Sequence, residues 1–363
     1  MTDGLRRTAA LFLFLVALPA HAAPVDERVE ALLSRMTLEE KLGQLIQYTT
    51  APPDLRERIE KGAVGSVFGI GTAAETNALQ RIAVEKSRLA IPLLIANDVI
   101  HGFRTIFPIP LAIASTWDPE SAELAARIAA REARAGGTRW TFAPMVDVAR
   151  DPRWGRVAEG AGEDPFLGSA IARAYVRGFQ GKDLASSESI LACAKHFAAY
   201  GAAEAGRDYN STDMSERMLR EVYLPPFKAA VDEEVGTIMT AFNALNAVPS
   251  TVNPHLLRTI LRQEWGFRGV VDSDYEAIVQ VIPHGVAATP QEAAIQAIAA
   301  GVDMDMVDGS YATLAAAVNE KRLDVRLVDD AVRRVLRAKF AVGLFDQPYA
   351  DEKRESAVHL TKE

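Results

Sequence analysis

The sequence contains a single cysteine in 363 residues, so no disulfide can form within the chain. Cys193 lies in the apolar run 190–194, which favours a buried thiol that packs in a core over a reactive one. A fold that depends on internal disulfides is therefore excluded. One cysteine remains compatible with a bacterial periplasmic or secreted protein that does not use disulfides for its stability.

Long hydrophobic runs and clusters of basic residues are also missing. The apolar run at the N-terminus, Leu11–Leu18, is well short of the roughly 20 residues that cross a membrane. Arg6 and Arg7 precede this run and Ala20-His21-Ala22 follows it, which is the order of a signal peptide and its cleavage site. We therefore predict that residues 1–22 are a signal peptide and that the protein is periplasmic or secreted, with no membrane segment after cleavage. The net charge of −8 excludes a nucleic-acid partner, because neutralising phosphates needs Lys and Arg.

Several motifs that bind metals or cofactors are absent. The chain has no HExxH and no cluster of His and Cys at metal spacing, so we expect no metal site. It has neither a P-loop nor a GxSxG elbow. The glycines of 65–71 have the wrong spacing for a dinucleotide fingerprint. We therefore expect no cofactor.

The remaining pattern is a regular alternation of strands and helices. Residues 26–46 are predicted as a helix, with Thr37 and Glu40 at capping-box spacing. Short apolar runs then alternate with helical periodicity and predict strands near 62–70, 92–97, 140–147, 190–196, 236–242, 269–274 and 302–307. Seven such units, with an eighth strand unrecognised in the N-terminal half, favour a single α/β domain over 23–345 that is a (β/α)8 TIM-like barrel. A doubly wound sheet is the alternative, and 346–363 is predicted as a polar tail or the start of a linker.

Polar residues interrupt the ends of nearly all these strands. In a (β/α)8 barrel the active site lies at the carboxyl ends of the strands, so these side chains would converge on one rim. Carboxylates with Arg, Lys, His and aromatic rings suit a carbohydrate, because carboxylates and cations hydrogen-bond to sugar hydroxyls and a ring packs on a sugar face. A carboxylate there can also attack an anomeric carbon. The residues at the predicted rim are Asp98, His101, Asp147, Arg156, Lys195, His196, Asn243, Asp272 and Asp274.

Four segments at these strand ends resemble a known family. The runs ANDVIHG (96–102), DPRWGRVAEGAGEDP (151–165), KHFAAYG (195–201) and GVVDSDYEAI (269–278) are similar to the glycoside hydrolase family 3 β-glucosidases, and the resemblance extends from about residue 26 to 350. It implies an exo-acting, retaining enzyme that hydrolyses terminal non-reducing β-D-glucosyl residues of β-glucosides and short oligosaccharides. By the same resemblance Asp274 is the nucleophile, and the residues that hold the terminal sugar are Asp98, Arg156, Lys195, His196 and Phe242.

The sequence departs from this family at the second carboxyl group that retaining hydrolysis needs. In two-domain members the acid/base is a Glu from a second domain after the barrel, so we expect the acid/base to lie outside this chain, in a C-terminal domain that is missing from it. The N-acetylglucosaminidase branch instead carries a His where this chain has Tyr200, whose ordinary pKa near 10 makes it a poor acid at neutral pH. Glu204 and Asp208 lie on the same loop. The alternatives left open are a β-N-acetylglucosaminidase, a β-xylosidase and an inactive sugar-binding barrel.

Some candidate residues have a rival structural explanation. Asp272 is two residues before Asp274, and strand alternation places both on one face, although the family usually has an apolar residue there. Lys195 and His196 would point to opposite faces of a regular strand, so one of them would be structural unless the strand bends. Arg153 and Glu163 are predicted to form an ion pair that shapes the DPRWGR loop, and Asp303 and Asp305 are predicted to be structural.

Overall fold

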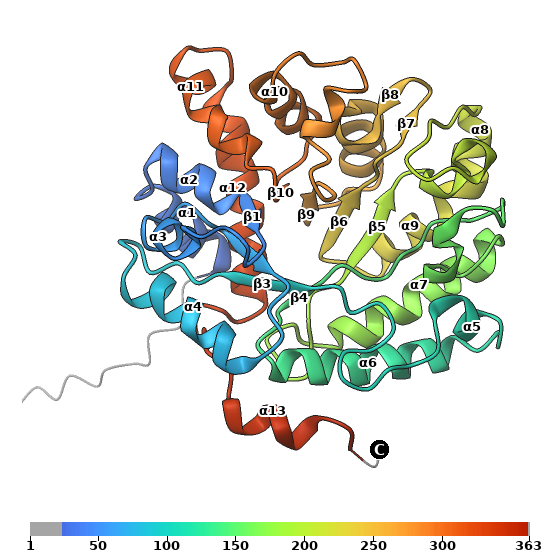
Figure 1. The fold of residues 1–363 in the computed structure, drawn as a ribbon, viewed down its shortest axis with the longest axis horizontal. Helices are drawn as coiled ribbons and strands as arrows, with labels where there is room; N and C mark the ends of the chain where they lie inside the picture. The colour runs from blue at the N-terminus through green and yellow to red at the C-terminus, as the bar shows by residue number, and fades with distance from the viewer. Residues whose placement is uncertain (1–23, 362–363) are drawn as a thin grey trace, which may run out of the picture.

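A ring of parallel strands forms the centre of the molecule, and helices surround it (Figure 1). The computed structural model describes residues 24–361, so the predicted signal peptide lies outside the described residues. The strands of the ring are β1 (Ile46–Tyr48), β2 (Ser66–Phe68), β3 (Leu94–Asn97), β4 (Trp140–Thr141), β5 (Cys193–Phe197), β6 (Thr237–Thr240), β9 (Val270–Asp272) and β10 (Asp305–Met306).

Two sheets and the bridges between them close this ring. A five-stranded sheet runs in the order β10-β1-β2-β3-β4, and a three-stranded sheet runs β5-β6-β9. The parallel bridge Trp140–Leu191 joins β4 to the chain just before β5, and the parallel bridge Asp272–Met304 joins β9 to the chain just before β10. The five strands and the three strands together make the (β/α)8 barrel that the alternation predicted.

Helices alternate with these strands along the chain. They are α1 (Val25–Leu33), α2 (Leu38–Gln44), α3 (Leu55–Glu60), α4 (Ala73–Glu85), α5 (Pro110–Ala114), α6 (Pro119–Ala135), α7 (Pro165–Gln180), α8 (Glu216–Met218), α9 (Pro225–Asp232), α10 (Pro290–Ala300), α11 (Leu314–Asn319), α12 (Val325–Ala341) and α13 (Glu352–Val358). A π-helix, η6 (His255–Glu264), takes the same place before β9. The loop after β6 forms a small antiparallel hairpin of β7 (Ala244–Leu245) and β8 (Val248–Pro249).

Local sequence signals set several helix boundaries. The Thr37 side chain accepts a hydrogen bond from the Glu40 N–H, and the Glu40 carboxylate accepts one from the Thr37 N–H, so the capping box starts α2. The single helix predicted over 26–46 is therefore wrong: it is two helices followed by β1, the strand that the pattern left unrecognised. Asn253 and Thr289 stabilise the first turns of two later helices, because their side-chain oxygens accept hydrogen bonds from N–H groups at the starts of η6 and α10.

The C-terminal segment after α12 packs against the outside of the barrel. Its helix α13 lies beside α6 and α4 at the edge of the molecule, and it buries none of its own side chains (Figure 1). Glu355 accepts a hydrogen bond from the N–H of Ala73, and the Asn77 amide donates to the Glu352 carboxylate. Between residues 24 and 361, no helix is both long enough and apolar enough to cross a membrane.

Candidate active site

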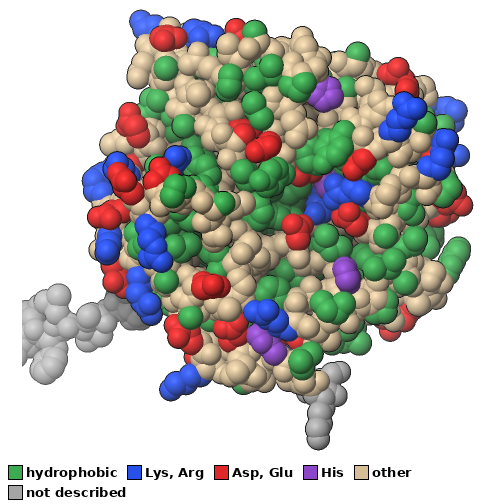
Figure 2. Space-filling view, viewed as in Figure 1, with side chains coloured by type: hydrophobic (Ala, Val, Ile, Leu, Met, Phe, Trp, Pro, Cys, Tyr) green, Lys and Arg blue, Asp and Glu red, His purple; other side chains and the backbone are tan. Residues whose placement is uncertain are grey.

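The predicted catalytic and sugar-binding residues lie at the carboxyl ends of the barrel strands or in the loops that follow them. Figure 2 shows a hollow near the middle of the visible face, with basic and acidic side chains at its edge. Because each of the predicted residues follows or ends a barrel strand, the closure of the barrel brings together side chains that are far apart in the sequence. We call this end of the barrel the barrel mouth, and its residues are Asp98, Asp147, Arg156, Lys195, His196, Phe242 and Asp274.

Lys195 and Asp98 form an ion pair across the mouth. The Lys195 Nζ donates to Asp98 Oδ1 at 2.9 Å, from a side chain that is 6% exposed to a carboxylate that is 51% exposed. Burial lowers the pKa of Lys195, but the carboxylates of Asp98 and Asp274 raise it, and the net pKa lies above the ordinary value. The ammonium group therefore stays charged, and Asp98 keeps an oxygen toward solvent.

His196 is fixed by the carboxylate of Asp147. Asp147 Oδ2 accepts the His196 backbone N–H at 3.0 Å and lies 2.8 Å from His196 Nδ1. Burial, with smaller effects of Arg156 and Lys195, lowers the pKa of His196 well below its ordinary value, so the ring is neutral. We assign the proton to Nδ1 because it faces a carboxylate oxygen, which leaves Nε2 as an acceptor that lies 3.5 Å from Asp274 Oδ2.

Both Lys195 and His196 reach the mouth because β5 is irregular. The register of β5 against β6 shifts between Ala194 and Phe197. Strict alternation therefore does not apply to these two residues, and the opposite faces expected for a regular strand are not observed. The sequence carries no local signal of this irregularity.

Asp274 follows β9 and is the carboxylate that faces His196. Its side chain is buried, with Oδ1 accepting the Tyr275 N–H at 2.6 Å. No described residue donates a hydrogen bond to Oδ2. Burial raises the pKa of Asp274, while Lys195, the Tyr275 N–H and Arg156 lower it, and the result is a pKa of about 6. Asp274 is therefore ionised at neutral pH and has one oxygen available for a reaction.

Asp272 lies deeper in the barrel than Asp274. It is fully buried, and neither of its carboxylate oxygens has a hydrogen-bond partner among residues 24–361. Burial, with smaller effects of the carboxylates of Asp274, Asp305 and Asp303, raises its pKa well above the ordinary value. Asp272 is therefore a neutral carboxylic acid inside the barrel, away from the side chains that line the mouth.

Arg156 and a group of aromatic rings form another side of the mouth. The Arg156 guanidinium binds Glu159 through two hydrogen bonds of 2.7 and 2.9 Å. Phe242 is buried, with its ring centroid 4.7 Å from that of Tyr209 and 5.8 Å from that of Tyr200. The strand-end pattern predicts Asp147 at the rim but not its pairing with His196, and it does not predict Tyr209.

The remaining predictions on structural residues have mixed outcomes. Asp303 and Asp305 are structural as predicted: Asp303 binds Arg262 and Arg334, and Asp305 accepts the Tyr311 N–H. The predicted Arg153–Glu163 ion pair is wrong, because Arg153 binds Asp151 two residues away. Asp151 also accepts the Arg153 backbone N–H, and this short turn brings the two side chains together.

In the described part of the chain, no group of His, Cys, Asp and Glu could hold a metal ion.

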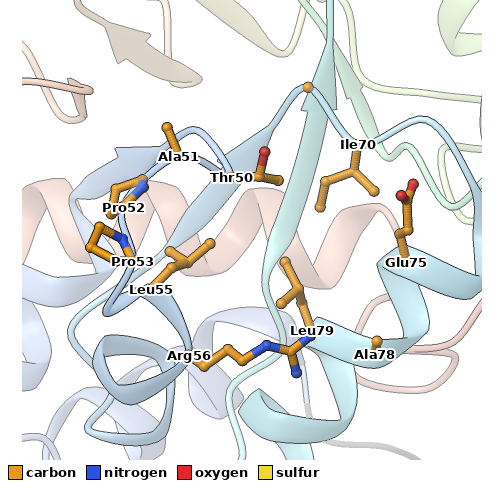
Figure 3. A pocket seen from close by; sticks show the side chains of 11 residues that line it. Thr50, Ala51, Pro52, Pro53, Leu55, Arg56, Ile70, Glu75, Ala78 and Leu79 are labelled. Carbon is orange, nitrogen blue, oxygen red and sulfur yellow. The ribbon is translucent and has the colours of Figure 1, made fainter.

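A separate pocket of about 440 Å³ lies beside the loops that follow β1 and β2 (Figure 3). Its lining includes one arginine and one glutamate, and none of the residues of the barrel mouth lines it. The lining residues are Thr50, Ala51, Pro52, Pro53, Leu55, Arg56, Gly69, Ile70, Glu75, Ala78 and Leu79.

Comparisons with known proteins agree on one family. Residues 37–338 match the model of the glycosyl hydrolase family 3 N terminal domain. The chain is 44% identical to a periplasmic beta-glucosidase of Salmonella typhimurium over 90% of this chain and 43% of that protein. It is 35% identical to a beta-xylosidase of Formosa agariphila over 93% of this chain and 47% of that protein.

A solved structure gives the same result for the fold. The beta-glucosidase of Listeria innocua in complex with glucose superimposes with a TM-score of 0.88 and 42% sequence identity, over 93% of this chain and 49% of that one. The chain thus spans about half the length of the relatives that it matches.

Proposed function

The chain belongs to glycosyl hydrolase family 3, and we propose that it provides the sugar-binding barrel and the nucleophile of an exo-acting, retaining β-glycosidase. The proposed substrates are β-glucosides and short oligosaccharides with a terminal non-reducing β-D-glucosyl residue. In the first step Asp274 Oδ2 forms a bond to the anomeric carbon while the bond to the leaving oxygen breaks. Water then hydrolyses the glycosyl-enzyme and restores the carboxylate.

One observation carries this proposal: the state of Asp274 in the barrel mouth. Its Oδ1 is anchored by the Tyr275 N–H, and its Oδ2 has no hydrogen-bond donor among the described residues. With a pKa of about 6, it is mostly ionised at neutral pH. A carboxylate that is fixed in orientation and not weakened by hydrogen bonds to the attacking oxygen is suited to nucleophilic attack.

The surrounding charges support a role in holding the sugar. Asp98 has an exposed carboxylate that can accept hydrogen bonds from two adjacent hydroxyls, and Lys195 beside it can donate to one of them. Arg156, on the loop after β4, helps to lower the pKa of Asp274. His196, on β5, has its Nε2 3.5 Å from Asp274 Oδ2. The partners of these residues fix their positions before the sugar binds. The groups therefore need no rearrangement during the reaction and can stabilise the transition state more than the bound substrate. We propose Phe242 as an apolar contact for the sugar.

We propose that the acid/base comes from outside residues 24–361. Asp98 and Glu159 bind Lys195 and Arg156, and the exposed Asp208 accepts from the Trp154 ring N–H. Burial raises the pKa of Asp147 to about 7, but the Asp147 side chain is buried and contacts His196. Burial also raises the pKa of Tyr200 far above its ordinary value, which makes it a still weaker acid. Each of these groups is therefore held by a cation or an N–H donor, is buried, or is too weak an acid, and none of them suits the role of a general acid at the mouth.

The site of action follows from the N-terminal sequence. We propose that residues 1–22 direct the chain to the periplasm or out of the cell. The relatives from Salmonella typhimurium and Dickeya chrysanthemi are both named as periplasmic enzymes, which supports this proposal.

A β-xylosidase is the second candidate, because the beta-xylosidase of Formosa agariphila is 35% identical over most of this chain. Xylose lacks the hydroxymethyl group of glucose. The comparison of dinitrophenyl β-glucoside with dinitrophenyl β-xyloside at equal concentration therefore tests which sugar the barrel prefers, and we expect the glucoside to react faster.

A leaving-group series tests the proposed reaction and the origin of the acid together. General-acid catalysis contributes about 10²–10⁴-fold, and a dinitrophenolate leaves without a proton whereas a sugar alkoxide does not. The 363-residue chain should therefore be glycosylated by dinitrophenyl β-glucoside and be nearly inert toward cellobiose, and azide should release the accumulated glycosyl-enzyme. Efficient cleavage of cellobiose would show that the acid is in this chain, with Glu204 and Asp208 the first residues to substitute. The absence of any glycosylation would refute the proposed function.

A further inference from the structure

A cluster of arginines lines a cleft at the opposite end of the barrel from the mouth. The cleft has a volume of about 570 Å³. Its residues precede strands or come from outer helices: Arg268 lies just before β9, and Arg334 and Arg337 lie on α12. Because the mouth residues follow the strands, the two sites face opposite ends of the barrel. The residues that line this arginine cleft are Asp26, Arg262, Phe267, Arg268, Arg334 and Arg337.

Two of these guanidinium groups are fixed by one buried carboxylate. Asp303 Oδ2 accepts from Arg262 at 2.7 Å, and Asp303 Oδ1 accepts from Arg334 at 2.8 Å. Asp303 is 1% exposed, and Oδ2 also accepts the Val271 N–H. One NH₂ group of Arg262 donates to the carbonyl oxygens of Phe267 and Gly269. Arg262 and Arg334 are therefore held in place, and Asp303 has no oxygen left without a donor.

The other two arginines are exposed and balanced by a single acid. Arg337 donates its Nε to Asp26 at 2.6 Å, which leaves its two NH₂ groups without a partner among the described residues. No residue of 24–361 forms a hydrogen bond or an ion pair with Arg268. The four arginines that line the cleft thus face two carboxylates, Asp26 in the lining and the buried Asp303 behind it.

We propose that the arginine cleft binds a phosphate-bearing ligand. The planar guanidinium groups present parallel N–H donors that match the oxygens of a phosphate group, and the negative charge of a phosphate complements the positive charge of the cleft. The nearby acids Glu30 and Asp330 share one cation, Arg333, and offset part of this charge. With these three residues included, five arginines face four carboxylates, so one net positive charge remains.

The exposed arginines allow a test that leaves the buried network intact. The Arg268→Ala/Arg337→Ala variant removes two donors from the cleft and leaves Asp303 with both of its partners. The matched control is Arg217→Ala/Arg326→Ala, which removes two exposed arginines outside the cleft that each pair with a nearby acid. One of them, Arg326, lies on the same helix α12 as Arg337. Melting temperatures of both variants check that each is folded.

Titration calorimetry with inorganic phosphate, at an ionic strength held constant with chloride, measures the affinity. We expect saturable binding by the wild type and the control, and binding weaker by about tenfold or more in the cleft variant. Sedimentation with phosphatidylglycerol vesicles, against phosphatidylcholine vesicles, distinguishes a lipid headgroup from a free phosphate. The proposal is supported if the cleft substitutions weaken binding to one of the two probes and the control substitutions do not. The probe that binds identifies the source of the phosphate. Equal effects of the two variants, or no saturable binding to either probe, would overturn it.

Discussion

Replacing Lys195 by methionine should shift the pH dependence of the nucleophile as well as weaken sugar binding. Lys195 is buried beside Asp98 at 2.9 Å, and it is the strongest of the influences that lower the pKa of Asp274 against the effect of burial. Methionine fills a similar volume and removes the charge. The substitution also leaves the Asp98 carboxylate without its cation, and Asp98 itself raises the pKa of Asp274. Both changes therefore favour the protonated form of Asp274.

The size of the effect follows from the ionised fraction of Asp274. With a pKa of about 6, half of the wild-type carboxyls are ionised at pH 6 and nearly all at pH 8. A neighbouring cation moves a carboxyl pKa by about 1–3, and the smaller value already lowers the ionised fraction at pH 6 from half to about a tenth. Because only the carboxylate attacks, the Lys195→Met variant should lose about fivefold more activity at pH 6 than at pH 8, in addition to its loss of hydrogen bonds to the sugar.

The assay is the release of dinitrophenolate in the first turnover across roughly pH 5–8. The first turnover measures glycosylation, so the result does not depend on an acid for the leaving group or on a base for deglycosylation. Lys182→Met, at an exposed position, is the matched control and should keep the wild-type profile. If Lys195→Met lowers the rate by the same factor at every pH, then Lys195 only binds the sugar, and our account of the Asp274 electrostatics is wrong.

Three further substitutions separate structural from catalytic roles. Asp272→Val should raise the unfolding free energy at pH 7 by about 1–3 kcal/mol, because it removes a buried acid whose oxygens have no partner. The folded state keeps a proton on Asp272 that the unfolded chain releases above about pH 4, so the wild-type free energy of unfolding should fall as the pH rises. Urea unfolding at several pH values should show a smaller fall for the Asp272→Val variant. A less stable variant would mean that the Asp272 carboxyl group has hydrogen-bond partners in the folded protein. Asp147→Asn should lower the first-turnover rate about 10–100-fold by releasing the His196 ring, with a nearly unchanged melting temperature, and the reverse pattern would make Asp147 structural. Asp98→Ala should reduce kcat/KM far more than stability, and near-normal turnover with early melting would show that its pair with Lys195 serves the fold.

The sequence pattern predicts most of the barrel but not its first strand. The apolar runs near 92–97 and 302–307 contain β3 and β10, since strands buried on both faces are continuously apolar. Strand β1 has three residues and follows α2 almost directly, so it has no turn signal before it and merges with the helical pattern. The capping box at Thr37 marks the true start of α2. The helical periodicity of the apolar residues continues from α1 into α2, so the pattern does not show the break between the two helices.

The position of the candidate residues at strand ends predicts that they lie close together in the barrel. Which of them contact one another depends on the three-dimensional arrangement of the strands and loops, which no local sequence pattern predicts. Asp98 and Lys195 are 97 residues apart and meet only because the barrel closes. The irregular β5 turns His196 toward Asp274 where alternation predicts the opposite face. Arg153 binds Asp151 rather than Glu163 because a two-residue turn is closer than any contact across the loop. The roles of Asp274 and of the sugar-binding residues stay predictions until they are measured.

The identity of the nucleophile is the central claim, and trapping of the glycosyl-enzyme tests it most directly. Incubation with dinitrophenyl 2-deoxy-2-fluoro-β-glucoside, followed by mass spectrometry of the intact protein and fragmentation of the labelled peptide, locates the attached sugar. Fragmentation is needed because Asp272 and Asp274 are two residues apart. We predict one sugar per chain, attached to Asp274, and no label on Asp274→Asn under the same conditions. A label on Asp272, or an equally labelled Asp274→Asn variant, would contradict the account.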